Sequence, residues 1–427
     1  MKPAAATALD RRVLETSQLG RLRALLTAVL AGNDFYRAKL AGLDANLDSL
    51  ETFQRRVPFT FKRELTENQA QYPPYGTNLT YPLERYTRYH QTSGTTGAPM
   101  RWLDTPESWA WMLDCWEQVY RATGVGRDDH IFFAFGFGPF LGFWTAFEAA
   151  ARLGCLVIPG GGMRSVTRLR TILDNGATVL CATPTYALRL AEVAAEEQIN
   201  LGAARVRRII VGGEPGGSIP ATRARIEQLW PGARVVDHHG MTEVGPVSYE
   251  CPRRAGVLHI MEAAYLPEVI HPDSGLPVDA GQTGELVLTN LGRDGSPLLR
   301  YRTGDVVRRA HQTPCRCGSH EMALEGGILG RTDDMLIVRG VNLYPSAIEE
   351  IVRSCGAVAE FLVQVTAAGS LPEVSIQLEP AGEDGDGLVR RVAAALENAF
   401  GLRIPVTPAA RGSLPRFEGK ARRWAAC

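Results

Sequence analysis

The chain has 427 residues, which is too many for a single hydrophobic core and indicates two or three domains of about 150 residues each. Its 45% hydrophobic and 22% charged residues are ordinary for a globular protein and exclude a disordered or fibrous chain. Lys and Arg total 46, as do Asp and Glu, so the net charge of zero gives no electrostatic support for a nucleic-acid or anionic-membrane partner.

The sequence also bears on the compartment. No run of about 20 apolar residues is present, and the first 18 residues lack the apolar core of a signal peptide. Eight cysteines are too few for a disulfide scaffold in a chain of this length. We therefore expect a cytoplasmic protein with no membrane partner.

The first 80 residues predict an amphipathic helix followed by a proline-rich connection. The segments RYTRYHQ and MRWLDT then predict a hairpin around the loop TSGTTGAP. A helix follows, with Thr105 as its cap and Pro106 at its first position.

From residue 131 to residue 240, short apolar runs such as TVLCAT and RIIVGG alternate with helical segments. This alternation predicts βαβ units and a parallel sheet that is buried on both faces. Ligands of such sheets bind beyond the carboxyl ends of the strands, where this chain has loops rich in Gly, His and Pro.

Beyond residue 256 the strands resemble hairpins, and beyond residue 330 two strands and two helices predict a compact α+β module. We therefore expect an α/β protein with two domains. Residues 1–330 would form a large N-terminal domain with a mostly parallel βαβ sheet plus an antiparallel β region. Residues 331–427 would form a small mobile α+β C-terminal domain, with the charged segment GRTDDM as the hinge.

A polar, glycine-containing loop is the first candidate for binding chemistry, since the common phosphate-binding motifs G-x-x-x-x-G-K-[ST] and G-x-G-x-x-G are absent from the sequence. Its backbone N–H groups and hydroxyls suit a polyphosphate that is held and then released. A polar turn without a ligand is the alternative interpretation. The loop consists of Thr92, Ser93, Gly94, Thr95, Thr96 and Gly97.

Later segments support a nucleotide site. Thr242 and Glu243 follow a predicted sheet strand, and Mg²⁺ normally takes one or two carboxylates plus substrate phosphates. Asp305 in YRTGD offers a carboxylate that could accept both hydroxyls of a ribose. Arg331 supplies a cation beside the predicted hinge, and Lys420 lies on a Gly-flanked loop near the C-terminus.

Taken in order and spacing, TSGTTG, HGMTEVG, YRTGD, GRTDDMLIVRG and EGKARR resemble the motifs of the adenylate-forming superfamily of acyl- and aryl-coenzyme A ligases. The segment RGVNLYPSAIEE in a chain of this length is similar to the phenylacetate–coenzyme A ligase branch. The resemblance runs from Thr92 to Lys420. It implies an enzyme that uses ATP to convert a carboxylic acid into an acyl-adenylate and then forms a thioester with coenzyme A.

The resemblance also implies a role for each matching residue. The loop from Thr92 to Gly97 would hold the β- and γ-phosphates, Thr242 would contact the α-phosphate, and Glu243 would bind Mg²⁺. Lys420 would bridge the acid and the α-phosphate, and Asp333 would be the hinge. His238 would lie beside the acid. Further nucleotide contacts are expected from Gly213, Glu214, Pro215, His239, Gly240, Met241, Asp305 and Arg331.

The implied lysine role agrees with elementary electrostatics. A carboxylate that attacks the α-phosphate of ATP brings two anions together, so a magnesium ion and one mobile cation address the barrier directly. The chain departs from the family at Ala98, where relatives commonly have a lysine. Arg101 could compensate for that lysine.

Cys251, His259, Cys315 and Cys317 form a second constellation, since thiolates and imidazole are the ligands that structural Zn²⁺ prefers. The spacing is not a standard zinc-finger pattern. Free thiols, a substitute ligand (His311 or His320) and the absence of a metal are the alternatives. The resemblance adds that members of this branch can carry such a cluster.

Seven of the fourteen phenylalanines lie between residues 132 and 147. Their position after a predicted sheet strand favours the lining of an apolar, aryl acid site, with Phe135, Phe137 and Phe140 as candidates. The alternative is that these rings belong to the core.

Two other functions remain open. The acyl group could pass to the phosphopantetheine of an acyl carrier protein instead of free coenzyme A, because both acceptors end in the same thiol. The protein could also be a catalytically silent nucleotide-binding protein, for which Ala98 and His239 are the support. A homodimer is compatible with the resemblance.

Overall fold

The computed structural model describes residues 10–92, 99–311, 313–339, 341–368, 371–382 and 384–426. The chain forms two compact units. The first comprises Met1–Gly162 and Val236–Gly327, and the second comprises Met163–Val235 and Ile328–Cys427. Both contain helices and strands, which confirms the predicted α/β class. The domain boundary after residue 330 stays a prediction.

Four helices begin the first unit: α1 (Arg11–Gly32), α2 (Asp34–Lys39), α3 (Leu50–Arg56) and α4 (Lys62–Gln71). The prediction of a single helix before the proline-rich connection is therefore wrong, whereas Pro73 and Pro74 do lie in the connection after α4. The side chains of Asn33 and Ser49 cap α2 and α3, which are too short to show helical periodicity in sequence. Leu22, Leu26 and Phe53 pack with Leu266 and Leu299 in one core.

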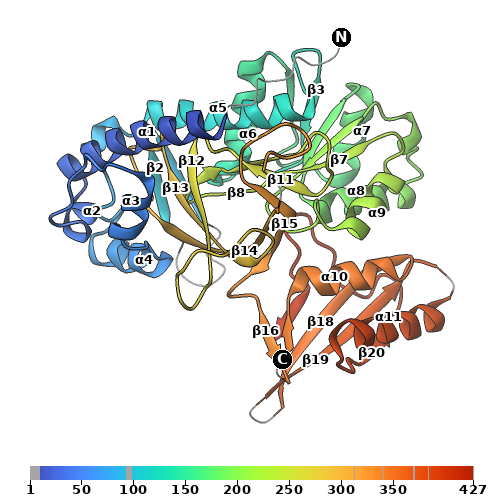
Figure 1. Ribbon diagram of the computed structural model, residues 1–427. Helices are drawn as coiled ribbons and strands as arrows, with labels where there is room; N and C mark the ends of the chain where they lie inside the picture. Colours follow the sequence, from blue (N-terminus) through green and yellow to red (C-terminus); the bar gives the residue numbers. More distant parts are fainter. Residues whose placement is uncertain are drawn as a thin grey trace. The chain divides into compact units, whose positions relative to one another are not determined.

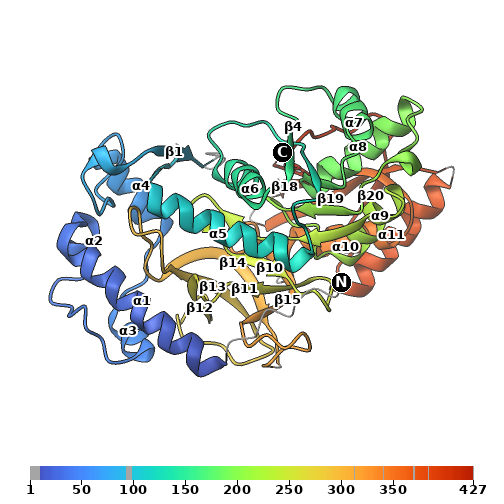
Figure 2. The same ribbon diagram turned by 90° about the horizontal axis from the view of Figure 1, so that it is seen from above.

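The predicted hairpin is confirmed as antiparallel strands β1 (Arg88–Gln91) and β2 (Arg101–Asp104). The helix α5 (Pro106–Thr123) follows, and the hydroxyl of Thr105 accepts a hydrogen bond from the backbone of Ser108 as its cap. Next come β3 (His130–Phe133), α6 (Leu141–Leu153) and β4 (Leu156–Pro159), with β3 and β4 parallel. Helices α5 and α6 lie side by side (Figure 2).

The second unit begins with alternating helices and strands: α7 (Ser165–Asp174), β5 (Val179–Ala182), α8 (Pro184–Glu196), β6 (Arg208–Val211), α9 (Pro220–Leu229) and β7 (Arg234–Asp237). Strands β5 and β6 are parallel, as the βαβ pattern predicted. All four residues of β5 are buried, which explains its continuous apolar sequence.

A six-stranded sheet has the order β10-β11-β15-β14-β13-β12, and its β10–β11, β11–β15, β12–β13 and β13–β14 pairs are antiparallel. These strands are β10 (Ser248–Glu250), β11 (Val257–Ile260), β12 (Tyr265–Ile270), β13 (Thr283–Asn290), β14 (Tyr301–Arg309) and β15 (Ala323–Arg331). The small pair β8 (Gly240–Met241) and β9 (Gly245–Pro246) precedes them. The predicted change from parallel to antiparallel strands is confirmed.

The C-terminal part of the second unit has its own core, drawn in orange and red in Figure 1. It contains β16 (Leu336–Val338), β17 (Val341–Leu343), α10 (Pro345–Ser354), β18 (Val358–Ala368), β19 (Leu371–Pro380), α11 (Gly385–Phe400), β20 (Val406–Pro408) and β21 (Trp424–Ala426). The four-stranded sheet has the order β20-β19-β18-β21. Ile348 of α10 and Val392 of α11 are fully buried with Val363 and Ile376 of the sheet.

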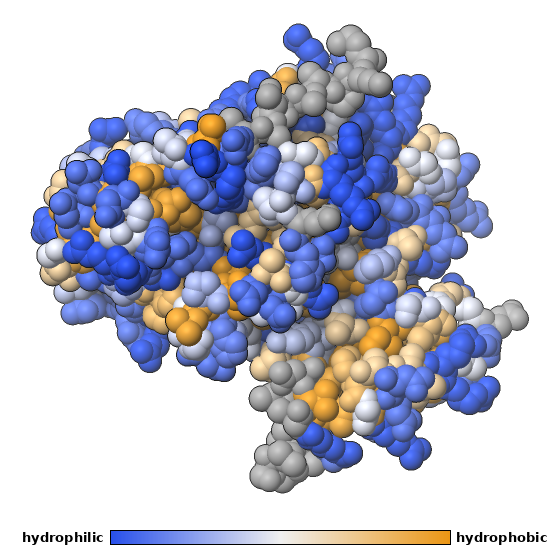
Figure 3. Space-filling view, viewed as in Figure 1, coloured by the Kyte–Doolittle hydropathy of each residue, from blue (hydrophilic) through white to orange (hydrophobic). Residues whose placement is uncertain are grey.

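Within the described part of the chain, no helix combines the length and the hydropathy needed to cross a membrane. On the face shown in Figure 3, hydrophilic residues predominate, and hydrophobic residues occupy smaller areas between them.

Candidate active site

The segment after β7 folds back on itself and presents Thr242 and Glu243 at a tight turn between β8 and β9. Gly245 has φ +96°, a conformation that favours glycine, and completes the turn. The backbone N–H of His239 donates to Ser248 Oγ at 3.1 Å, and the carbonyl of His239 accepts from Val247 at 3.0 Å. These contacts fix the predicted motif HGMTE at the end of a sheet strand.

His239 and Asp305 contact each other directly. His239 Nε2 lies 3.0 Å from Asp305 Oδ2, and both side chains are largely buried. Asp305 lies on β14, where its backbone N–H donates to Thr303 Oγ1 at 3.0 Å. The sequence predicted an adenine contact for His239 and a ribose contact for Asp305. The structure brings the two side chains together, and their contacts with a nucleotide stay predictions.

Glu243 is buried, and Lys62 at the start of α4 lies close to its carboxylate, with 3.5 Å between Lys62 Nζ and Glu243 Oε1. Sequence reasoning missed Lys62. It is one of only four lysines in a chain whose other basic residues are arginines, which is the one signal that could have drawn attention to it. Glu243 offers one carboxylate at this turn, and Mg²⁺ normally takes one or two carboxylate ligands from a protein in addition to substrate phosphates.

A buried ion pair supports the same turn. Arg293 donates from Nε to Asp104 Oδ1 at 2.6 Å and from Nη2 to Asp104 Oδ2 at 2.8 Å, and both side chains are 0% exposed. Arg293 Nη1 also donates to the backbone carbonyls of Thr242 and Glu243 at 2.7 and 2.8 Å. One guanidinium therefore joins the end of β2 to the predicted magnesium-binding turn.

His238, a predicted acid contact, is buried. Its ring packs on Trp116 with 4.2 Å between ring centroids, and its Nδ1 lies 2.7 Å from the carbonyl oxygen of Ser248. Burial lowers the pKa of His238 to about 4, against the opposing effect of that carbonyl. The ring is therefore neutral at pH 7.

The predicted aryl-binding phenylalanines lie between β3 and α6 and pack on aromatic residues of α6. Phe135 stacks on Phe143 with 4.0 Å between centroids, and Phe137 contacts Trp144 edge to face at 5.0 Å. Phe140, the residue before the helix, is 36% exposed. The rings are thus partly packed and partly exposed, and their contact with a substrate stays a prediction.

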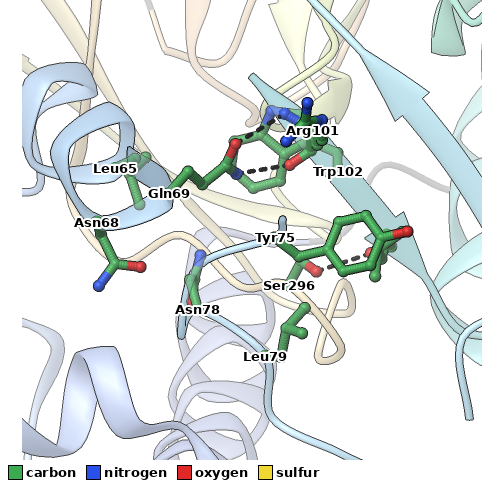
Figure 4. Close-up of a pocket in the computed structure, with 10 residues that line it drawn as sticks. Leu65, Asn68, Gln69, Tyr75, Asn78, Leu79, Arg101, Trp102 and Ser296 are labelled. Atoms are coloured by element: carbon green, nitrogen blue, oxygen red, sulfur yellow. Dashed lines mark hydrogen bonds between the residues drawn. The ribbon is translucent and has the colours of Figure 1, made fainter. Parts of the chain in front are cut away.

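Of the predicted phosphate loop, Ser93, Gly94, Thr95, Thr96 and Gly97 lie outside the described residues. Thr92 Oγ1 accepts a hydrogen bond from the backbone of Met100 at 3.0 Å. Arg101, the proposed substitute for a phosphate-binding lysine, donates from Nη1 to the carbonyl of Pro74 at 2.9 Å. It lines a small pocket with Gln69 (Figure 4), so its guanidinium already has a protein partner.

In the second unit, Lys420 lies beside the loop after β6. Lys420 Cε is 3.4 Å from the position that a Cβ atom on Gly213 would occupy. Gly213 has φ +90°, a backbone conformation that favours glycine at this position. Two predicted nucleotide-site motifs, far apart in sequence, thus meet at this point.

Glu214 and Pro215 follow Gly213. Pro215 is exposed, whereas the Glu214 carboxylate accepts hydrogen bonds from the backbone N–H groups of Thr185 and Ala421. Desolvation raises the pKa of Glu214, and these donors oppose the rise.

Arg331 and Asp333 lie at the end of β15 and in the turn after it. They form a two-point ion pair, with 2.8 Å between Arg331 Nε and Asp333 Oδ1 and 3.1 Å between Arg331 Nη2 and Asp333 Oδ2. The predicted ribose-assisting cation and the predicted hinge residue are therefore partners of each other.

The four predicted zinc ligands converge, and their ligand atoms all lie within 4.8 Å of one another. Cys251 Sγ lies 3.8 Å from Cys315 Sγ, and Cys317 Sγ lies 3.4 Å from His259 Nε2. Zinc–sulfur bonds of about 2.3 Å place two ligands of a tetrahedral site about 3.8 Å apart. The geometry therefore fits a closed four-ligand zinc site.

Two family models match the chain. The family model described as AMP-binding enzyme matches residues 89–292, and the model described as AMP-binding enzyme C-terminal domain matches residues 340–425. The chain is 33% identical to phenylacetate–coenzyme A ligase from Pseudomonas putida, over 96% of this chain and 93% of the relative. The corresponding enzyme from Thermus thermophilus is 32% identical over 96% of both chains.

Among solved structures, 2-hydroxyisobutyryl-CoA ligase in the postadenylation state matches with a TM-score of 0.92 and 28% identity, over 99% of this chain and 91% of that chain. The same ligase in the thioesterification state with CoA matches with a TM-score of 0.74, over 100% of this chain and 94% of that chain. With relatives of this identity and coverage, the chain belongs to the phenylacetate–coenzyme A ligase family of AMP-binding enzymes.

Proposed function

We propose that this protein uses ATP to activate an aromatic carboxylic acid as its acyl-adenylate and then transfers the acyl group to the thiol of coenzyme A. The observation that carries the proposal is the similarity to phenylacetate–coenzyme A ligases over 96% of the chain. The polar residues that the reaction needs are present in the matching motifs.

In the first half-reaction, the acid carboxylate attacks the α-phosphate and pyrophosphate leaves. Lys420 would lie between the two anions and reduce their repulsion, while the hydroxyl of Thr242 would orient the α-phosphate. Asp305 would accept hydrogen bonds from the ribose hydroxyls, assisted by Arg331, and its contact with His239 orients the carboxylate.

Glu243 would hold a magnesium ion, which supplies positive charge to the phosphates when bound. Lys62 lies 3.5 Å from the same carboxylate and adds a second cation at this turn. Because Ala98 replaces the usual lysine of the phosphate loop and Arg101 is bound to Pro74, Lys62 is the better substitute for the missing charge.

In the second half-reaction, the thiol attacks the carbonyl carbon of the mixed anhydride, and AMP leaves. Residues 331–427 would rotate about Asp333 between the two steps and withdraw Lys420. A related ligase, 28% identical to this chain, has been solved in a postadenylation state and in a thioesterification state with CoA, which supports such a change.

The phenylalanines between β3 and α6 support an aryl acid, since Phe140 offers an exposed ring next to the stacked pair Phe135 and Phe143. Neutral His238 is suited to contact an uncharged part of the acid. Free coenzyme A is favoured over a carrier protein as acceptor, because the relatives matched over nearly their whole length are coenzyme A ligases. The cysteine and histidine cluster would hold a structural zinc ion with no position open for substrate.

The test is acid-dependent exchange of labelled pyrophosphate into ATP across phenylacetic, benzoic, hydroxyaryl and short aliphatic acids. We expect exchange with at least one aryl acid, followed by AMP release that requires coenzyme A. Thioester formation with a holo-carrier protein but not with coenzyme A would contradict the proposal that coenzyme A is the acyl acceptor. Absence of exchange with every acid would contradict the proposal that the protein catalyses adenylation and would favour a catalytically silent nucleotide-binding protein.

A further inference from the structure

The two peptide groups on either side of Lys420 are both hydrogen-bonded to other parts of the second unit. Thr183 Oγ1 donates to the carbonyl oxygen of Gly419 at 3.0 Å. The backbone N–H of Ala421 donates to Glu214 Oε2 at 2.6 Å. The backbone at Lys420 is therefore fixed before and after the lysine, independently of the lysine side chain.

Both partners, Thr183 and Glu214, are themselves hydrogen-bonded to the start of helix α8. The hydroxyl of Thr183 caps the helix by accepting from the backbone of Tyr186 at 3.1 Å, while its own hydrogen is directed to Gly419. Glu214 Oε1 accepts from the backbone of Thr185 in the first turn at 2.9 Å. A carboxylate at a helix N-terminus is stabilised by the helix dipole. These contacts therefore link the residues on either side of Lys420 to the start of α8.

Glu214 needs to be a carboxylate to make both contacts. Each of its oxygens accepts one backbone N–H, from Thr185 and from Ala421. A carboxamide has one acceptor oxygen and an NH₂ group, which would face the second N–H donor and leave it unsatisfied. Even an isosteric amide would therefore lose the contact with Ala421 or with Thr185.

The contacts of Thr183 and Glu214 with the residues flanking Lys420 are hydrogen bonds of single polar groups, so they can form and break. We infer that Glu214 is a positioning residue that holds the Lys420 backbone in place for the adenylation half-reaction and releases it for thioester formation. This inference rests on the proposed function, in which Lys420 acts in the first half-reaction only.

The test compares Glu214→Gln with the wild-type full chain in the two half-reactions separately. Exchange of pyrophosphate into ATP with phenylacetic acid measures the first, and thioester formation from supplied phenylacetyl-adenylate and coenzyme A measures the second. We expect exchange to fall about 10- to 100-fold, as for loss of a buried hydrogen-bond partner. Thioester formation should stay within about twofold, which also shows that the variant is folded. Thr183→Val should show the same split in a weaker form.

Glu227→Gln is the matched control, because Glu227 Oε1 accepts a single backbone N–H, from Val235 at 3.0 Å, away from the lysine. Both half-reactions should be unchanged in this variant. Wild-type exchange rates in Glu214→Gln, or an equal loss in both half-reactions, would overturn the inference while leaving the proposed function intact. Absence of exchange in the wild type with every acid would instead overturn the proposed function.

Discussion

His238 and His239 are sequence neighbours with different surroundings. His239 faces the Asp305 carboxylate, whereas His238 packs on Trp116 and directs Nδ1 to a backbone carbonyl. The alternation of side chains along an extended segment separates them. One histidine can therefore serve the nucleotide site while the other stays neutral.

The lowered pKa of His238 makes folding stability depend on pH. The folded chain has a pKa of about 4 and an unfolded histidine about 6.5, so the unfolded state binds more protons between these values. The free energy of unfolding therefore rises with pH across this window. The stability that comes from keeping His238 neutral is complete above pH 6.5 and is lost as the pH falls towards 4. We expect His238 to account for about 2 kcal/mol of the decrease in unfolding free energy between pH 7 and pH 5.

Chemical denaturation at the two pH values measures this effect. His238→Gln keeps a donor for the Ser248 carbonyl but does not titrate. The decrease in its free energy of unfolding between pH 7 and pH 5 should therefore be about 2 kcal/mol smaller than in the wild type. His271→Gln, at an exposed histidine, should behave like the wild type. An identical decrease in the wild type and His238→Gln would contradict the assignment.

The elements that the sequence predicted well are those with a local signal. The buried run of β5 and the Thr105–Pro106 start of α5 have one, whereas the short helices α2 and α3 have too few turns to show a period. The same holds for the candidate site residues, which the sequence reveals only where they belong to a local motif. Motifs identified Glu243 and Lys420, but not Arg293, because its partner Asp104 lies 189 residues away.

That long-range pair, Asp104 with Arg293, has a measurable role. Arg293→Met leaves Asp104 buried without its partner and removes both bonds to the Thr242–Glu243 turn. We expect the free energy of unfolding to fall by about 3–5 kcal/mol, as for other broken buried ion pairs. Denaturant unfolding measures this, with Arg85→Met in the exposed Arg85–Glu107 pair as a control that should change little. Wild-type stability in Arg293→Met would refute the account of this pair.

The loop between β14 and β15 brings Cys315 and Cys317 to the other two predicted zinc ligands, Cys251 and His259. We expect one zinc ion per chain by elemental analysis of protein purified under reducing conditions. Cys315→Ala should lose the metal and unfold at a lower temperature, because metal binding contributes to folding. Cys355→Ala, outside the cluster, should retain it. A metal-free wild type that is insensitive to chelator would disprove the zinc site.

For the whole molecule, the predicted division of labour assigns the nucleotide to the large domain and one mobile lysine to the small one. Within the second unit, Lys420 lies beside Gly213, and Thr183 and Glu214 bind the backbone on either side of it. The sequence predicted the lysine and its role by resemblance. The sequence could not predict the backbone contacts, because no local pattern around Thr183 or Glu214 indicates a partner more than 200 residues away.

The most direct test of the account is pyrophosphate exchange in Lys420→Ala, with phenylacetic acid as substrate and Lys39→Ala as a lysine control on α2. We predict that exchange falls about 10²- to 10³-fold in Lys420→Ala, as for loss of one preorganised donor, and is unchanged in Lys39→Ala. Thioester formation from supplied phenylacetyl-adenylate should persist in both variants. Exchange at the wild-type rate in Lys420→Ala would contradict the claim that this lysine brings the two anions together.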